Sequence, residues 1–319
     1  MRILVMGAGA VGGYFGGRLA QAGVVKEVAF LVRPGRKKQL DRDGLVIESP
    51  STGDFRSPVT ALLAEEVEPG WDVVLLTCKA YDLEAAVAAI RPAVDERTAV
   101  LPLLNGLSHI DTLEAAFGKG RVLGGLAKVQ ATLALEGVVR HLAPFTALEF
   151  GELDGRTTER VLALEAAFAR TPIKVEAVSD IRGRMWEKLT FLGALAAATV
   201  LMRANLGEIA HAPQGGAWLE RLLQRNAAIA AAHGYPVRSE AMEREFLPFF
   251  RTAVPGSAGA TASMLRDLEA GGRIEADHIL GFLLDAARRA GLPDELHEAA
   301  YLHAKAYEAR REARRFPGS

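Results

Sequence analysis

The chain has 319 residues, of which 50% are hydrophobic and 24% are charged, with 38 basic side chains against 39 acidic ones. At about 150 residues per domain, this length favours two domains. The balanced charge and the apolar content exclude an intrinsically disordered chain and a strongly basic nucleic-acid-binding protein, and they favour a small-molecule partner.

The first half of the chain alternates short β-branched runs with helical patterns, which is typical of βαβ units and a mostly parallel sheet. Strands are predicted at 3–6, 28–32, 45–47, 73–77, 99–103, 121–126, 138–141, 147–152 and 173–176, and helices at 11–21, 82–90, 110–117 and 158–169. Turn signals separate the closing strands, so we expect them to form an antiparallel extension of the sheet.

From Ser179-Asp180 onward the pattern is helical. Helices are predicted at 180–202, 214–233, 239–250, 261–270, 275–290 and 293–315. The predicted fold class is therefore α/β, with an N-terminal Rossmann dinucleotide-binding domain at residues 1–178 and an all-α C-terminal domain for substrate binding or dimerisation at residues 179–319.

A glycine-rich turn follows the first predicted strand and opens the first helix, with the sequence Gly7-Ala8-Gly9-Ala10-Val11-Gly12. This is the G-x-G-x-x-G pattern. Its glycines permit a tight turn, backbone approach to a diphosphate, and close packing of helix on strand, while the helix N-terminus offers free N–H groups. The strand before it and the helix after it favour dinucleotide binding over a merely glycine-rich turn.

The end of the second predicted strand indicates which dinucleotide binds. NAD enzymes carry an acidic residue about 20 positions after the glycines, but here Val32 is followed by Arg33 and a basic run that ends at Lys38. A guanidinium at this position can bind the 2′-phosphate of NADP. The sequence therefore favours NADPH/NADP as the cofactor, with a solvated basic loop as the alternative.

Two polar residues follow predicted strands at the edge where an open parallel sheet binds ligands. They are Lys79, in Thr77-Cys78-Lys79-Ala80, and Asn105, in Leu103-Leu104-Asn105-Gly106. Both can face the nicotinamide end of a cofactor, but from the residues alone a surface lysine and an Asn-Gly turn are the favoured explanation. The single cysteine, Cys78, is interpreted as a small core residue and not as a nucleophile.

The same cysteine count excludes an internal disulfide and a zinc site built on thiolates, as expected in a reducing cytosol. The longest apolar run, at residues 191–202, is shorter than the roughly 20 residues that cross a bilayer. The N-terminus imitates a signal peptide, but its glycines begin already at Gly7. We expect a cytoplasmic protein with no metal, no nucleic-acid partner and no membrane span.

Taken in order, six segments resemble the motifs of ketopantoate reductases (2-dehydropantoate 2-reductases), and together they extend over nearly the whole chain. They are GAGAVG, LVR, TCKAYD, LLNG, DIRGRMWEKL and SMLRDLEAGGRIEAD. The resemblance implies NADPH-dependent reduction of a 2-oxo acid to a 2-hydroxy acid by an oxidoreductase whose active site lies between the two domains. The family reaction converts 2-dehydropantoate (ketopantoate) to pantoate in pantothenate biosynthesis. A homodimer is also possible.

The resemblance also implies roles for individual residues. Lys188 matches the catalytic lysine that protonates the developing alkoxide, and Asn105 matches an asparagine that contacts both cofactor and substrate. The remaining matches are Lys79 and Ala131 to cofactor contacts, Ser263 to a serine that binds the substrate carboxylate, and Glu275 to an acidic residue that reaches the cofactor. From the residues alone, Lys188, Ser263 and Glu275 would pass for ordinary helix residues.

Three positions depart from the family. Leu192, Ala196 and Leu206 stand where well-known members carry asparagines, although Asn205 is adjacent to the third position. A buried polar group without a partner costs roughly 1–3 kcal/mol, so recognition of ketopantoate should weaken. This leaves two alternatives, a reductase of a more apolar 2-oxo acid and a non-catalytic protein that senses NADP(H).

Overall fold

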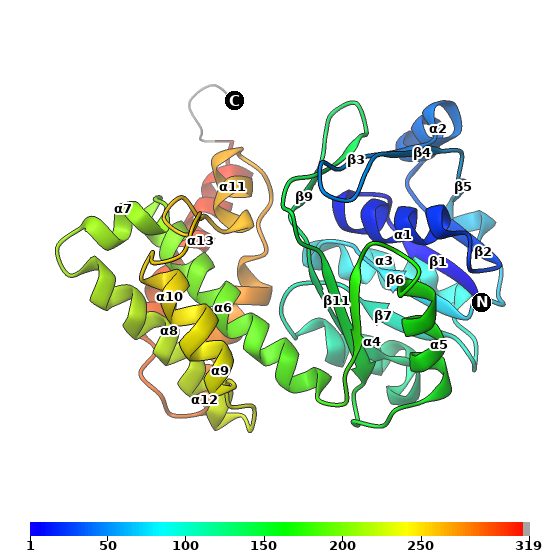
Figure 1. Cartoon of the computed structure of the whole chain (residues 1–319). Coiled ribbons are helices and arrows are strands. Elements are labelled where there is room, and N and C mark those ends of the chain that lie inside the picture. Colours follow the sequence, from blue (N-terminus) through cyan, green and yellow to red (C-terminus); the bar gives the residue numbers. More distant parts are fainter. Residues whose placement is uncertain (315–319) are drawn as a thin grey trace. The chain divides into compact units, whose positions relative to one another are not determined.

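Strands and helices alternate through the first half of the chain and helices alone fill the second half (Figure 1). This computed structural model describes residues 1–314. The chain divides into two units close to the boundary predicted at residue 178. The first unit contains Met1–Leu104 and His109–Ile181, and the second contains Asn105–Ser108 and the chain from Arg182 onward. The α/β fold class, a Rossmann domain followed by a helical domain, is confirmed.

A five-stranded parallel sheet forms the centre of the Rossmann unit, in the order β5-β2-β1-β6-β7. Its strands are β1 (Arg2–Met6), β2 (Glu27–Leu31), β5 (Thr60–Leu62), β6 (Val73–Leu76) and β7 (Ala99–Pro102). After β1, the chain adds β2 and β5 on one side of this strand and then adds β6 and β7 on its other side. Beyond the carboxyl ends of β1 and β6 lies the switch point at which such sheets bind ligands.

The helices of this unit are α1 (Ala10–Ala22), α2 (Pro34–Asp43), α3 (Leu83–Ile90), α4 (His109–Phe117) and α5 (Glu159–Phe168). Short 3-10 turns lie at Ala64–Glu66, Ala80–Asp82, Arg91–Ala93 and Lys119–Arg121. Helix α1 packs closely on the sheet, because a Cβ at Gly16 would stand 2.8 Å from both Val5 and Phe30. Helix α2 is the one helix of this unit that the sequence did not predict, since it buries only Leu40 and therefore has no apolar stripe.

The remaining strands form two small sheets. One has the order β4 (Phe55–Ser57), β3 (Leu45–Glu48), β10 (Val139–His141), β9 (Ala131–Leu133), and the other has β12 (Lys174–Ala177), β11 (Ala147–Glu152), β8 (Leu123–Lys128). The predicted antiparallel extension is therefore correct only in part. An isolated bridge between Val100 and Val122 joins the end of the central sheet to the chain that enters β8. The pairs β9–β10 and β8–β11 are antiparallel, but β3–β10 and β11–β12 are parallel. Parallel pairs need a long crossover, and α5 supplies it between β11 and β12.

The second unit is helical, as predicted, with α6 (Ile181–Met202), α7 (Leu206–His211), α8 (Gly215–Ala232), α9 (Ser239–Ala241), α10 (Leu247–Phe250), α11 (Ser263–Glu269), α12 (Phe282–Arg289) and α13 (Glu295–Glu312). Two predicted helices contain π-helical turns, at Met242–Phe246 and Asp277–Gly281. Such turns often occur at functional sites. Arg315, the predicted end of the last helix, lies outside the described residues.

Helix α6 is the central helix of this unit. Its Trp186 stacks on His233 with ring centroids 5.3 Å apart, and a Cβ at Gly193 would lie only 2.4 Å from the Leu283 side chain. Asn226 on α8 donates a hydrogen bond to the Thr190 carbonyl at 3.1 Å. By length and composition alone α6 could cross a membrane, but 67% of its most apolar window is buried inside the protein, as in a core helix.

Candidate active site

The glycine turn joins β1 to α1 in a geometry that requires glycine at positions 7 and 12. Gly7 has a φ of 101°, and a Cβ at Gly12 would lie 2.1 Å from the Gly7 carbonyl oxygen. At Gly9, which precedes the first residue of α1, a Cβ would meet nothing within 4 Å. No side chain caps this helix and no acidic residue lies in its first turn. The turn therefore fits the diphosphate of a dinucleotide, because an anion can approach the helix N-terminus directly.

Thr77 ties the end of β6 to the glycine turn. Its hydroxyl donates to the Met6 carbonyl at 2.8 Å and lies 3.3 Å from where a Cβ of Gly7 would be. Lys79 follows two residues later as an exposed residue that precedes a 3-10 turn. The predicted lysine therefore lies at the carboxyl edge of the sheet, beside the switch point.

Arg33 occupies the position that follows β2 and precedes α2. Its side chain is 81% exposed, and its guanidinium forms an ion pair with Asp82 at 2.9 Å. An exposed pair of this kind contributes little stability, so the guanidinium can exchange Asp82 for another anion. Ala131, the other predicted cofactor contact of this unit, is the first residue of β9 and pairs with His141 of β10.

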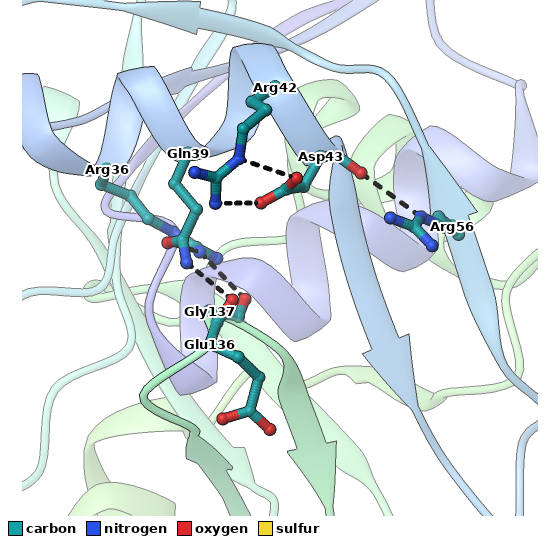
Figure 2. A network of polar contacts seen from close by, with 7 residues as sticks. All are labelled: Arg36, Gln39, Arg42, Asp43, Arg56, Glu136 and Gly137. Atoms are coloured by element: carbon teal, nitrogen blue, oxygen red, sulfur yellow. Dashed lines mark hydrogen bonds and ion pairs between the residues drawn. The ribbon is translucent and has the colours of Figure 1, made fainter.

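One residue near the glycine turn was not singled out by the sequence. Arg36, which Figure 2 shows in the first turn of α2, donates from Nε to the Ala8 carbonyl at 3.1 Å. The only sequence signal for it was its place in the basic run after Arg33, and that run offers several cations among which the pattern cannot choose.

In the helical unit, α6 carries Lys188 and two of the departures from the family. Lys188, Leu192 and Ala196 are spaced by four residues and therefore share one face of the helix. Lys188 and Leu192 are half-buried, and Ala196 is buried. The neighbouring Glu187 is held by the Arg238 guanidinium through two hydrogen bonds of 2.6 and 2.9 Å. One and two turns beyond Lys188, this face is aliphatic.

Thr199, further along α6, holds the helix that begins at Ser263. Its hydroxyl donates to the Leu195 carbonyl at 2.8 Å and accepts a hydrogen bond from the Ala262 N–H at 3.3 Å. Ala262 precedes α11, whose first residue is the exposed Ser263. The structure therefore fixes the start of α11 against the helix that carries Lys188.

The loop that carries Asn105 belongs to the helical unit, although β7 and α4 flank it in sequence. The Ser108 hydroxyl and His278 Nδ1 lie 2.8 Å apart, and a Cβ at Gly106 would lie 2.8 Å from the His278 carbonyl oxygen. His278 belongs to the π-helical turn that follows the buried Glu275. The loop of Asn105 is thus docked beside the segment of Glu275.

Leu206, the third departure, is fully buried as the first residue of α7. The adjacent Asn205 does not replace the family asparagine, because its side chain caps α7 by accepting from the Glu208 N–H at 2.9 Å. The predicted residues thus fall into two sets. The glycine turn, Arg33, Lys79 and Ala131 lie in the Rossmann unit, and Asn105, Lys188, Ser263 and Glu275 lie in the helical unit.

Comparisons with known proteins match most of the chain to one protein family. Residues 3–155 match the family described as ketopantoate reductase PanE/ApbA, and residues 180–308 match ketopantoate reductase PanE/ApbA C terminal. A Bacillus subtilis protein named uncharacterized oxidoreductase YkpB is 36% identical over 97% of this chain and 99% of the relative.

Solved structures with the same fold carry two different names. The structure of 2-dehydropantoate 2-reductase from Methylococcus capsulatus has a TM-score of 0.85 at 29% identity, over 98% of both chains. The ternary structure of D-mandelate dehydrogenase with NADH and anilino(oxo)acetate has a TM-score of 0.84 over 98% of this chain and 100% of the other. At 21% identity, this second likeness shows the fold alone.

Proposed function

The chain belongs to the ketopantoate reductase family, a family of oxidoreductases that use NAD(P)H, and we propose that it uses NADPH to reduce a 2-oxo acid with an aliphatic side chain. The observation that carries this proposal is the face of α6, which keeps Lys188 but places Leu192 and Ala196 one and two turns beyond it. The lysine supports the reaction type, and the aliphatic neighbours define the substrate class.

The Rossmann unit supplies the groups that hold the cofactor. The N-terminus of α1 at Gly9 fits the diphosphate, and Lys79 and Ala131 are its further proposed contacts. Arg33 favours NADPH, because it stands after β2 where an NAD enzyme would carry a carboxylate. Arg33 would hold the 2′-phosphate of a bound NADPH in exchange for its ion pair with Asp82.

The helical unit supplies the groups that act on the substrate. The reduced nicotinamide, when bound, supplies a hydride for the carbonyl carbon of the 2-oxo acid. The ammonium of Lys188 then gives its proton to the developing alkoxide, which yields the 2-hydroxy acid. Ser263 and Asn105 bind the substrate carboxylate and carbonyl, and Glu275 contacts the cofactor. These roles follow the family motifs at the positions described above.

The substrate class follows from the apolar replacements. Ketopantoate carries a 4-hydroxyl, and Leu192, Ala196 and Leu206 offer it no hydrogen-bond partner. An aliphatic side chain gains about 0.8 kcal/mol for each methylene that it buries against the half-buried Leu192. The fold also serves a protein named D-mandelate dehydrogenase, so its use is not confined to one 2-hydroxy acid.

The test is NADPH oxidation by the purified protein with a panel of 2-oxo acids that includes ketopantoate and branched aliphatic analogues. We expect turnover with several of them and the highest kcat/KM with an analogue that lacks the 4-hydroxyl. Binding of NADPH without oxidation by any 2-oxo acid would contradict the enzyme assignment and favour a protein that senses NADP(H). Preference for ketopantoate would restore the family reaction and, with it, a role in pantothenate biosynthesis.

A further inference from the structure

Arg36 connects three segments of the Rossmann unit (Figure 2). From its place in the first turn of α2, Nε donates to the Ala8 carbonyl of the glycine turn at 3.1 Å, a contact that lies outside the residues drawn in the figure. Nη1 donates to the Gly137 carbonyl at 2.9 Å and to the side-chain oxygen of Gln39 at 2.7 Å. The planar guanidinium thus fixes the glycine turn relative to α2 and to the turn between β9 and β10.

Gln39 reinforces this connection. One helical turn after Arg36, its side-chain nitrogen donates to the Glu136 carbonyl at 2.6 Å. Gly137 has a φ of 85°, and a Cβ there would lie 2.1 Å from the Gln39 side chain. The β9–β10 turn is therefore shaped to receive the two side chains of α2, and Figure 2 shows both pointing from the helix to this turn.

The charge of Arg36 has no partner of opposite sign. All its hydrogen bonds go to neutral acceptors, and within residues 1–314 it forms no ion pair with a carboxylate. Arg42 on the same helix, by contrast, pairs with Asp43 at 2.7 Å. Arg36 is half-buried, and this burial lowers the pKa of its guanidinium. A half-buried cation beside a diphosphate-binding turn is stabilised when an anion binds there.

The bond to Ala8 also orients the glycine turn. The carbonyl of Ala8 and the N–H of Gly9 belong to one planar trans peptide, so they point in opposite directions. By holding the carbonyl, Arg36 directs the Gly9 N–H away from itself. Gly9 lies at the open N-terminus of α1, where a Cβ would meet nothing within 4 Å.

We propose that Arg36 is a positioning residue for the cofactor diphosphate, because it fixes the Ala8–Gly9 peptide and places an uncompensated positive charge beside the glycine turn. This inference rests on the proposed use of a nicotinamide dinucleotide. It assigns Arg36 a role different from that of Arg33. Arg33 distinguishes NADPH from NADH through the 2′-phosphate, whereas Arg36 acts on the diphosphate that both cofactors share.

The experiment compares the dissociation constants of NADPH and NADH, by fluorescence titration, for the wild type, Arg33→Ala and Arg36→Ala. Arg36→Ala removes the charge beside the glycine turn and releases the Ala8–Gly9 peptide, so it should raise both constants by about tenfold or more and leave their ratio unchanged. Arg33→Ala should raise the constant for NADPH alone. At saturating cofactor, Arg36→Ala should keep kcat within about twofold while KM for the cofactor rises.

Arg42→Ala is the matched control, because it removes an arginine from the same helix and should leave both constants unchanged. Arg36→Lys keeps the charge but lacks the planar guanidinium, so it should bind both cofactors less tightly than the wild type does. If Arg36→Ala does not fold, Gln39→Ala serves instead. It removes one acceptor of Arg36 and one hydrogen bond to the β9–β10 turn, so it should weaken the binding of NADPH and of NADH by the same factor.

Three results would overturn the inference. They are unchanged constants for both cofactors in Arg36→Ala, a loss confined to NADPH, and full recovery in Arg36→Lys. The proposed function fails in a different way. A wild type that binds NADH and NADPH equally, with both weakened by Arg36→Ala, would refute only the NADPH preference, and a wild type that binds neither would refute both proposals.

Discussion

The hydroxyl of Thr199 accepts a hydrogen bond from the main-chain N–H of Ala262 at 3.3 Å. Through this contact, the helix that carries Lys188 holds the start of the helix that begins at Ser263. Sixty-three positions separate the two residues in the chain, so the contact is invisible to any local pattern.

Replacing Thr199 by valine should destabilise the protein and weaken substrate binding. The buried N–H of Ala262 would lose its acceptor, which costs roughly 1–3 kcal/mol. Urea unfolding measures the stability, and KM for the 2-oxo acid should rise because Ser263 is no longer fixed. Thr190→Val is the matched control. The buried Thr190 hydroxyl bonds to no other residue within 1–314, so its removal should be neutral or stabilising, and an equal loss in both variants would contradict the prediction.

The bond between Ser108 and His278 should matter for turnover more than for stability. Ser108→Ala and His278→Phe each remove this bond and loosen the loop of Asn105, so each should lower kcat/KM by up to about tenfold. Because both variants remove the same interaction, the double variant should be no worse than either one. Steady-state kinetics of the four proteins measure the coupling. Additive losses would show that the two residues act independently.

Lys188→Ala should abolish turnover and spare cofactor affinity. A positioned general acid accelerates a reaction by roughly a hundredfold to ten-thousandfold, and the variant leaves the alkoxide without a proton donor. Single-turnover NADPH oxidation and a separate NADPH titration distinguish the two effects. The control is Lys174→Ala, an exposed lysine on β12. Near-normal turnover in Lys188→Ala would show that Lys188 is not the proton donor and has only a structural role on α6.

The pair Leu192→Asn and Ala196→Asn should shift specificity toward a hydroxylated substrate. The wild type should favour the deoxy analogue of ketopantoate, because its α6 face is aliphatic at both positions. The double variant should raise kcat/KM for ketopantoate relative to the analogue by about twofold to tenfold, since a recovered neutral hydrogen bond is worth roughly 0.5–1.5 kcal/mol. A wild type that prefers ketopantoate a hundredfold would show that other residues bind the hydroxyl.

The stability of the protein should depend on pH through His297. This buried side chain bonds through Nε2 to the Asn226 side chain at 2.6 Å, and its burial lowers its pKa from 6.5 to about 4. The unfolded chain therefore binds the proton more tightly. The stabilising contribution of the neutral ring is complete above pH 6.5 and is lost as the pH falls toward 4.

This difference between the pKa of His297 in the unfolded and in the folded chain corresponds to about 3 kcal/mol of unfolding free energy. Unfolding free energies measured across this interval should therefore rise with pH, and His297→Gln should flatten the rise. Burial also lowers the pKa values of His141 and His303, so part of the dependence should remain. A variant with the full wild-type slope would contradict the assignment to His297.

Local signals were sufficient to predict the first strand, the glycine turn and the first helix of the Rossmann unit. The strand that ends at Met6, the glycine spacing and helix α1 are neighbours in sequence, and each element imposes its own pattern. Strands β4, β5 and β9 were missed: each has three residues and shows no clear alternating pattern, whereas β10, which is equally short, was predicted. Helix α2 was missed because six of its ten residues are charged and only Leu40 is buried.

The candidate site was predictable only where motifs name its residues. The resemblance gave Lys188, Ser263 and Glu275, but no spacing rule places the loop of Asn105 beside His278, which lies 170 positions after Ser108. Arg36 was hidden for a similar reason, because its acceptors belong to the glycine turn and to the β9–β10 turn. These contacts arise when distant segments pack.

The capping arrangement at the start of α7 limits how an asparagine, which other family members carry at the position of Leu206, could be introduced there. Asn205 and Glu208 bond reciprocally, at 2.9 and 2.8 Å, and Leu206 is fully buried between them in sequence. Sliding the chain by one residue, so that Asn205 takes the place of Leu206, would break both bonds and expose a leucine. Evolution or design could therefore restore an amide here only by direct replacement of Leu206, and a shift of register offers no intermediate route.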